Sequence, residues 1–175
     1  MLTCSLKNKL VQYNRERLNL EERVKPMNEY LILENQLCFS IYEASSQFNK
    51  LYTKALQTFG LTYTQYLTLL VLWESDGMTI KDIGERLHLG TGTLTPMIKR
   101  MEANGWVKKE RSATDQRKVA VYQQSKAIEE KQAIIEKIAV EVQSCNIDFE
   151  EYETLMEQLS LLREKLNQKN DQLKE

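Results

Sequence analysis

The sequence predicts a mainly α-helical fold with one small β-wing. Over most of the 175 residues, apolar side chains recur every three or four positions, which is the spacing of amphipathic helices. Two short β-prone runs, residues 106–111 and 118–123, interrupt this spacing and are joined by a polar stretch. Short helices followed by such a hairpin are the order of elements in a winged helix-turn-helix. We therefore expect this fold, with amino- and carboxy-terminal helices that form a dimerisation region.

The composition is that of a globular, helix-rich protein without a cofactor. Hydrophobic residues make up 42% of the chain, charged residues 28%, and the formal net charge is −1. This balance excludes a protein that coats nucleic acid with its whole surface but allows a local basic patch. Cys4, Cys38 and Cys145 are too scattered for a disulfide framework or a zinc site. With His88 as the only histidine, we expect no metal, no cofactor and no catalytic Cys–His pair.

The sequence lacks the features of a membrane or secreted protein. No apolar run approaches the roughly 18 residues that a spanning helix requires. The amino terminus has no uncharged apolar core of a secretory signal. We therefore expect a cytoplasmic, thiol-reducing setting and no membrane partner.

Composition and turn residues divide the chain into four parts. Residues 1–26 are rich in Lys, Arg, Asn and Glu, and we interpret them as an extension or flexible arm before a natural start at Met27. The expected parts after it are the amino-terminal helix of the dimerisation region (27–60), the winged helix-turn-helix (61–124) and the carboxy-terminal dimerisation helices (125–175).

The amino-terminal half is expected to contain two long helices. The first covers residues 33–59 and ends at Gly60. Its apolar stripe has heptad-like spacing and consists of Leu37, Ile41, Ala44, Phe48, Leu51 and Ala55. The second helix begins after Thr62, which can form a capping box with Gln65, and it closes at Gly77.

The next segment predicts the helix-turn-helix itself. Thr79 is placed to cap a short helix over residues 80–87, and a tight connection through residues 89–92 leads to a second helix from Leu94 to Asn104. Gly105 ends this second helix, and the β-prone runs follow at once. The second helix is therefore the candidate recognition helix, and the hairpin is the wing.

Two helices are expected after the wing. One runs from about Ser125 to Val142, with Ile134, Ile138 and Val142 directed inward. The other begins near Asp148 and carries an apolar stripe of Phe149, Tyr152, Met156, Leu159, Leu162 and Leu166. Because this stripe has no obvious partner within so small a domain, it predicts a homodimer interface. The alternative is that it packs against the first helix of the same chain.

Charge is segregated along the chain. Residues 90–122 contain seven basic and three acidic residues, a net charge of +4, whereas residues 148–165 carry a net charge of −4. A nearly neutral chain that collects positive charge on its helix-turn-helix and wing is typical of a protein that reads duplex DNA.

Ten residues of the basic segment are candidates for DNA contact. They are Thr91, Thr93, Thr95, Lys99, Arg100, Lys108, Lys109, Arg111, Asp115 and Arg117. The threonines open the recognition helix, where backbone N–H groups and short side chains allow close approach to phosphates and the major groove. Arg117 at the wing tip can enter the minor groove, and Asp115 is placed to orient it. For each of these charges the alternative is a solvated surface side chain.

Four segments carry a resemblance to a known family. They are the runs 33–39 (LENQLCF), 61–67 (LTYTQYL) and 92–97 (GTLTPM), and the Asp115-x-Arg117 wing. Together they resemble the MarR family of bacterial regulators, and within it the organic-peroxide-sensing branch of the OhrR and SarZ type. The resemblance covers the chain from about Leu33 to its end, and it implies a repressor that binds an inverted-repeat operator as a dimer.

The resemblance implies that Cys38 senses organic hydroperoxides. Near the start of a helix the dipole favours a thiolate, the form that attacks peroxide. Tyr42 lies one turn beyond on the same face, and Tyr52 and Tyr63 match tyrosines that approach the cysteine from the other subunit. Oxidation to sulfenic acid, and then to a disulfide with a small thiol or with protein, is expected to release DNA. Spacing alone favours the alternative of an inert buried cysteine.

Cys145 lies where some family members carry a resolving cysteine, and the alternative is a spectator thiol. The sequence also departs from the family in two places. Gly90, followed by Thr91, stands where close relatives carry an acidic residue, which bears on operator preference rather than on DNA binding. The run Tyr122-Gln123-Gln124-Ser125 replaces the usual Leu-Thr end of the wing.

Three other functions are alternatives to peroxide sensing. A MarR-type regulator that responds to a small aromatic ligand, or that controls virulence or metabolic genes, would not need Cys38. A thiol peroxidase-like enzyme would leave the basic winged motif unexplained and lacks a histidine beside Cys38. A helical scaffold without DNA contact would leave the charge segregation unexplained.

Overall fold

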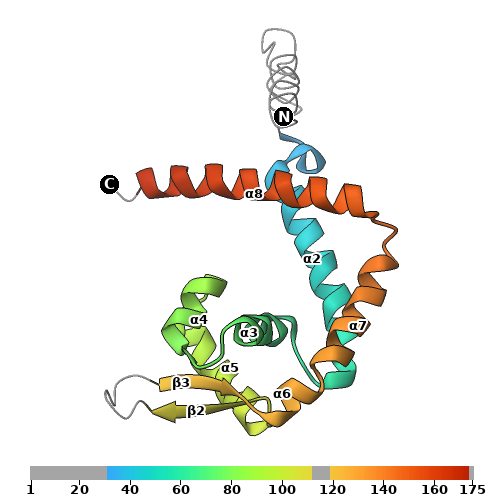
Figure 1. The fold of residues 1–175 in the computed structure, drawn as a ribbon. Helices are drawn as coiled ribbons and strands as arrows, with labels where there is room; N and C mark the ends of the chain where they lie inside the picture. The colour runs from blue at the N-terminus through green and yellow to red at the C-terminus, as the bar shows by residue number, and fades with distance from the viewer. Residues whose placement is uncertain (1–30, 112–118, 174–175) are drawn as a thin grey trace, which may run out of the picture. The chain divides into compact units, whose positions relative to one another are not determined.

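The computed structural model describes residues 31–111 and 119–173 (Figure 1). The chain divides into two units, one that ends at Phe48 and one that begins at Asn49, and each is described by itself. No helix of the described residues is long and apolar enough to cross a membrane.

Several predictions concern residues outside these ranges. The expected extension, residues 1–26, and the start at Met27 lie outside the described residues, and so does Cys4. Asp115 and Arg117, which were predicted for the wing tip, also lie outside them. These assignments stay predictions.

The amino-terminal helix is interrupted near both ends. It consists of a 3-10 turn η2 (Leu33–Asn35), the helix α2 (Leu37–Leu56) and a second 3-10 turn η3 (Gln57–Phe59). The prediction of one continuous helix is wrong at Gln36, whose backbone is extended with a ψ of 121°. At the other end, Gly60 adopts the left-handed conformation with a φ of +66°, which ends the helix after a tightened last turn.

Two capped helices follow, as predicted. The helix α3 (Tyr63–Glu74) begins at a capping box in which Thr62 Oγ1 accepts the Gln65 N–H at 3.4 Å and Gln65 Oε1 accepts the Thr62 N–H at 2.8 Å. The helix α4 (Ile80–Leu87) begins at Thr79, whose hydroxyl accepts the N–H of the third helical residue at 3.2 Å.

The recognition helix begins earlier than predicted. The helix α5 covers Thr91–Ala103, whereas the sequence predicted a start at Leu94. The difference arises because the N–H groups of Thr93 and Leu94 both donate to the Gly90 carbonyl, at 3.0 and 3.1 Å. The backbone therefore closes the first turn without a side-chain cap. The buried residues of α5 are Leu94, Met97, Ile98 and Met101.

The wing is part of a three-stranded antiparallel sheet. The strand β2 (Val107–Arg111) pairs with β3 (Val119–Gln123), with Val107 opposite Gln123. A two-residue strand, β1 (Met78–Thr79), pairs with the other edge of β3, and the order is β1–β3–β2. The sequence did not predict β1, because two residues are too few to show the alternation of a strand.

Three helices follow the wing. The helices α6 (Ser125–Glu129) and α7 (Lys131–Gln143) replace the single helix that was predicted, and the break lies at Glu130, where ψ is −6°. The helix α8 (Phe149–Gln172) begins where predicted, at Asp148, whose carboxylate accepts the N–H of the third helical residue at 2.8 Å.

One hydrophobic core holds the helix-turn-helix, the base of the wing and α7 together. Its largest fully buried side chains are Leu56, Leu69, Leu72, Ile83, Leu94, Ile98, Met101, Trp106, Val107, Val121 and Ile134. Figure 1 shows β2 and β3 beside α5 and α6, in agreement with the contacts between these elements. Ile134 and Ile138 face inward as predicted. By contrast, α8 contributes no buried residue.

Candidate nucleic-acid interface and thiol site

The first turns of α5 present small polar side chains to solvent. Thr91, Thr93 and Thr95 are exposed, while Leu94 between them is fully buried. No side chain caps this end at Gly90. Backbone N–H groups at such a helix end, together with the helix dipole, favour phosphate.

Two exposed cations lie farther along the recognition helix. Lys99 and Arg100 are exposed, whereas their neighbours Ile98 and Met101 are fully buried. Because Ile98 and Met101 fix the inner face of α5, both cations lie outside the core. They extend the face that begins with the threonines.

Two of the predicted wing cations are paired with carboxylates. Lys109 Nζ lies 2.8 Å from Glu102 Oε2, and the Lys109 backbone N–H donates to Glu102 Oε1 at 3.0 Å. Lys108 Nζ lies 2.6 Å from Glu110 Oε1 and 5.7 Å from the centre of the Tyr122 ring. The hydrogen bond with Lys109 lowers the pKa of Glu102, and the hydrogen bond with Glu110 raises the pKa of Lys108.

Glu102 therefore joins the recognition helix to the wing. Its carboxylate holds both the main chain and the side chain of Lys109, and the Lys109 side chain is only 30% exposed. In the sequence Glu102 is visible only as one of the three acidic residues of the basic segment, because its contact with Lys109 joins two different elements. Arg111, at the outer end of β2, is exposed.

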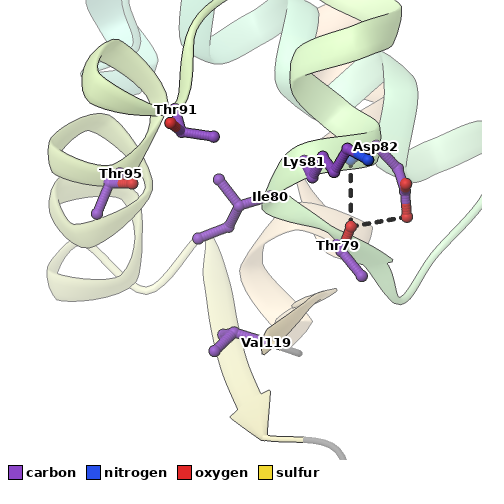
Figure 2. Close-up of a pocket in the computed structure, with 7 residues that line it drawn as sticks. All are labelled: Thr79, Ile80, Lys81, Asp82, Thr91, Thr95 and Val119. Carbon is purple, nitrogen blue, oxygen red and sulfur yellow. Dashed lines mark hydrogen bonds between the residues drawn. The ribbon is translucent and has the colours of Figure 1, made fainter. Parts of the chain in front are cut away.

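An open pocket lies where α4, α5 and β3 meet (Figure 2). It has a volume of about 500 Å³ and is lined by Thr79, Ile80, Lys81, Asp82, Thr91, Thr95 and Val119. The Thr79 hydroxyl donates to Asp82 Oδ2 at 2.7 Å and accepts the Asp82 N–H, so these groups satisfy each other. A second pocket, of about 390 Å³, shares Ile80, Thr95 and Val119 with the first and continues to Glu102, Lys109 and Arg111. Both pockets are thus lined by residues of the recognition helix and of the wing.

Cys38 and Tyr42 lie in the unit that ends at Phe48. Cys38 is the second residue of α2, and its free thiol is exposed. Tyr42, one turn later, is also exposed, and its ring stacks on that of Phe39 with centroids 6.4 Å apart. In the single chain Cys38 is therefore accessible to a small oxidant, unlike the buried cysteine of the alternative interpretation.

Tyr52 and Tyr63 lie together in the other unit. Their ring centroids are 5.0 Å apart, and the Tyr66 ring is 5.8 Å from that of Tyr52. Burial raises the pKa of Tyr52, and the neighbouring groups of Tyr63, Tyr152 and Cys145 raise it further. Burial also raises the pKa of Tyr66 to about 12. Tyr52 and Tyr66 therefore stay protonated at neutral pH and can donate hydrogen bonds.

Cys145 lies between α7 and α8. Its thiol is free and exposed, and Sγ lies 3.6 Å from the Glu141 carbonyl oxygen. It belongs to the same unit as Tyr52 and contributes to the raised Tyr52 pKa. Within residues 31–111 and 119–173, no three His, Cys, Asp or Glu side chains gather into a possible metal site.

The apolar stripe of α8 is largely exposed. Phe149, Tyr152, Met156, Leu159 and Leu166 are each 49–75% exposed. Since α8 buries no residue in the core, the stripe remains open to a partner surface.

Comparisons with known proteins assign the chain to a family. The model of the SarA/Rot transcriptional regulators matches residues 50–134. The organic hydroperoxide resistance transcriptional regulator of Bacillus subtilis is 39% identical over 147 residues, which cover 81% of this chain and 97% of the relative. The chain belongs to the MarR-like winged-helix family of transcription regulators. The resemblance seen in the sequence is thus confirmed.

Solved structures of AbfR extend the comparison to different redox states. Reduced AbfR bound to DNA is 40% identical, with a TM-score of 0.67, over 81% of this chain and 99% of AbfR. Overoxidised AbfR bound to DNA is 40% identical, with a TM-score of 0.66 and the same coverage. Disulfide-formed AbfR is 40% identical, with a TM-score of 0.57, over 77% of this chain and 95% of AbfR. A crystal structure identifies AbfR as a protein of Staphylococcus epidermidis.

These relatives fix the general function and the fold. The mainly helical winged helix-turn-helix predicted from the sequence is confirmed by the structure and by the structural neighbours. As a member of this family, the protein is a transcription regulator, and homologous regulators bind DNA.

Proposed function

We propose that this MarR-like regulator is a redox-sensing repressor. It binds an inverted-repeat operator as a homodimer when Cys38 is reduced, and it releases the operator after an organic hydroperoxide oxidises Cys38. One observation carries the proposal. Cys38 is an exposed free thiol at the start of α2, in a chain 39% identical to an organic hydroperoxide resistance regulator.

The chemistry needs only a thiolate, a peroxide and a second thiol. The Cys38 thiolate attacks one peroxide oxygen, so that an S–O bond forms and the O–O bond breaks. The leaving alkoxide takes a proton and departs as an alcohol, which oxidises the sulfur by two electrons and reduces the peroxide. A second thiol then attacks the sulfenic sulfur, forms a disulfide and releases water.

We assign the release of DNA to the disulfide rather than to oxidation alone. AbfR has been solved on DNA both when reduced and when overoxidised, and it has also been solved with a disulfide formed. The exposed thiol of Cys145 is one candidate for the second sulfur, and a small cellular thiol is the other. Tyr52 and Tyr63, which share the unit of Cys145, are proposed to approach Cys38 of the other subunit.

We assign the DNA contacts to α5 and the wing. The threonine-lined end of α5 is proposed to enter the major groove, with Lys99 and Arg100 on phosphates or base edges. The wing, with Arg111 in β2 and Arg117 at its tip, is proposed to reach the adjacent minor groove. The exposed stripe of α8 is proposed to join two copies, which sets the spacing of the two recognition helices.

The test is the effect of cumene hydroperoxide on operator binding. A fluorescent duplex that carries the promoter of the chain's own gene is titrated with reduced protein, and anisotropy is followed while peroxide and a small thiol are added. Wild-type protein should release the duplex and Cys38→Ser should hold it. Release that persists in Cys38→Ser contradicts the proposal.

Cys145→Ser is the matched control, since it also removes one exposed thiol. If Cys145→Ser releases DNA only when a small thiol is present, the disulfide partner in wild type is Cys145. If it behaves like wild type without added thiol, Cys145 is a spectator. A reduced wild-type protein that ignores this duplex at moderate ionic strength would remove the DNA-binding half of the proposal as well.

A further inference from the structure

Gln123 belongs to the run at the end of the wing that departs from the family pattern, and it forms two hydrogen bonds with α3 and the turn after it. Gln123 Nε2 donates to the Leu72 carbonyl oxygen at 2.8 Å, and the Gln123 backbone N–H donates to Asp76 Oδ1 at 2.9 Å. The two bonds join the last residue of β3 to the end of α3, across about 50 residues of sequence. We call these two bonds the wing junction.

The Gln123 side chain fills a position that no backbone donor of the helix can fill. The last carbonyl groups of an α-helix lack an intrahelical N–H partner. In α3, Ser75 N–H donates to the Val71 carbonyl at 3.0 Å, and the next carbonyl, that of Leu72, accepts from Gln123. Leu72 is fully buried, so water is poorly placed to replace this donor. The junction is therefore specific for a side chain with an N–H at this position.

The turn after α3 contacts β3 a second time. Gly77 has a φ of +73°, and its N–H donates to the Val121 carbonyl at 3.1 Å. A Cβ at this position would lie 2.7 Å from Cε1 of Tyr122, so only glycine admits the ring so close to the turn. The Tyr122 ring in turn lies 5.7 Å from Nζ of Lys108, one of the predicted DNA-contacting residues.

Gln124 fixes the other side of the wing base. Its Nε2 donates to the Val107 carbonyl at 2.5 Å, and its backbone N–H donates to the Trp106 carbonyl at 3.0 Å. These bonds tie β3 to the start of β2. A movement at Gln123 is therefore transmitted to both strands of the wing.

We propose that Gln123 is a positioning residue for DNA binding, which holds the wing at the angle at which its cations and α5 contact one duplex together. A change in wing angle at Gln123 also moves Arg111. Gln123 pairs with Val107 at the start of β2, and Arg111 lies four residues farther along the same strand. At about 3.3 Å per residue, Arg111 lies roughly 13 Å from the junction, so a small tilt of the wing at Gln123 displaces Arg111 more than the residues near the junction. The inference rests on the proposed contact between wing and DNA, and it does not depend on Cys38.

The experiment compares Gln123→Met with Gln132→Met. Methionine keeps the length of the side chain and removes its N–H donor. Gln132 is the matched control, because its Nε2 donates to Glu136 Oε1 at 2.8 Å on the exposed surface of α7. Operator affinity of the reduced proteins is measured by anisotropy at salt concentrations from about 50 to about 300 mM KCl. Over a range of this order, the fall of affinity with salt reports the number of phosphates contacted. Circular dichroism gives the folded fraction at the assay temperature.

Gln123→Met should weaken operator affinity about tenfold and make the slope of log K against log salt shallower by about one phosphate contact or more. Gln132→Met should match wild type in both. The salt slope separates positioning from folding, because a smaller folded fraction lowers the apparent affinity without changing the number of phosphates contacted. If Gln123→Met does not fold, Asp76→Ala replaces it, with an expected loss of about threefold.

Two results would overturn the proposal. One is an unchanged affinity and slope in Gln123→Met, and the other is a loss that follows the folded fraction with an unchanged slope. Failure of the proposed function is seen in the wild-type protein instead. If wild-type protein does not bind the duplex, the role of Gln123 is removed as well. If wild-type protein binds the duplex but does not respond to peroxide, only the redox part of the proposed function fails.

Discussion

The region of α5 and the wing buries its large apolar side chains, whereas α8 exposes them. Around α5 and the wing, Leu94, Ile98 and Trp106 are at most 1% exposed. On α8, Leu159 is 52% exposed and Phe149 is 75% exposed, and no residue of this helix is buried. The first region is complete within one chain. The second presents an apolar surface of the kind that a partner covers.

The two regions also differ in net charge. Residues 90–122 carry a net charge of +4 and residues 148–165 a net charge of −4. Positive charge attracts phosphate and negative charge repels it, which agrees with the proposed contact between DNA and the wing. The proposed function therefore assigns DNA contact and association to separate parts of the chain, which substitutions can test one at a time.

The largest effect is expected from a core leucine. Leu94→Ala should lower the free energy of unfolding by about 2–5 kcal/mol, because Leu94 is fully buried and its removal leaves a cavity. Urea denaturation followed by circular dichroism measures this value. At concentrations where single chains prevail, Leu159→Ala should lower it by less than about 1 kcal/mol. Equal losses for the two variants at every protein concentration would contradict the contrast between the regions.

A charge on the α8 stripe should act on association. Leu159→Glu is expected to raise the dimer dissociation constant roughly 100-fold, on the order of 2.7 kcal/mol, because it removes apolar surface and places a carboxylate in the contact. Sedimentation equilibrium measures the constant. Gln158→Glu adds the same charge one residue away and should leave it unchanged. If both variants dissociate equally, net charge rather than the stripe controls association.

The sequence allowed the local features of the fold to be predicted. The capping box of Thr62 and Gln65 and the cap at Thr79 are set by residues three positions apart, so their patterns can be read directly. The start of α5 was misplaced because its first turn is closed by the Gly90 carbonyl, a backbone group that leaves no sequence signal. The break at Glu130 likewise has no signal in the residue types around it.

The site was predictable only in part, for a related reason. Candidate cations could be recognised in the sequence, but the carboxylate of Glu102 that holds Lys109 lies on another element. Similarly, the partners of Gln123 lie 47 and 51 residues away, so its role could not be read from spacing. The roles of Cys38 and Tyr52 were inferred from family resemblance, since neither residue type nor periodicity separates a sensor from a core residue.

Arg117→Ala tests the DNA side of the comparison. It should weaken operator affinity by more than about tenfold, or about 1.4 kcal/mol, while the dimer stays intact, because a minor-groove contact is lost without loss of core or interface. An electrophoretic shift titration measures the affinity. Arg163→Ala on α8 removes the same side chain from the acidic region and should have no such effect. Unchanged affinity in Arg117→Ala would exclude this contact.

The smallest expected effect is the pH dependence of the contact between Glu102 and Lys109. In the folded protein the hydrogen bond with Lys109 lowers the pKa of Glu102, whereas in the unfolded chain this pKa is about 4.3. The carboxylate therefore stabilises the fold above pH about 4.3, and this contribution is lost as the pH falls through the lower pKa of the folded state. Glu102→Gln should lower the free energy of unfolding at pH 7 by on the order of 0.5 kcal/mol, and the difference from wild type should shrink below pH about 4. Urea denaturation at pH 7 and at pH about 3 measures it. In a Lys109→Met background the same substitution should show a smaller change with pH, because only the backbone N–H of residue 109 still lowers the pKa of Glu102. A difference that is as large at pH about 3 as at pH 7 would contradict a contribution of the Glu102 charge, and with it the role of the ion pair in joining α5 to the wing.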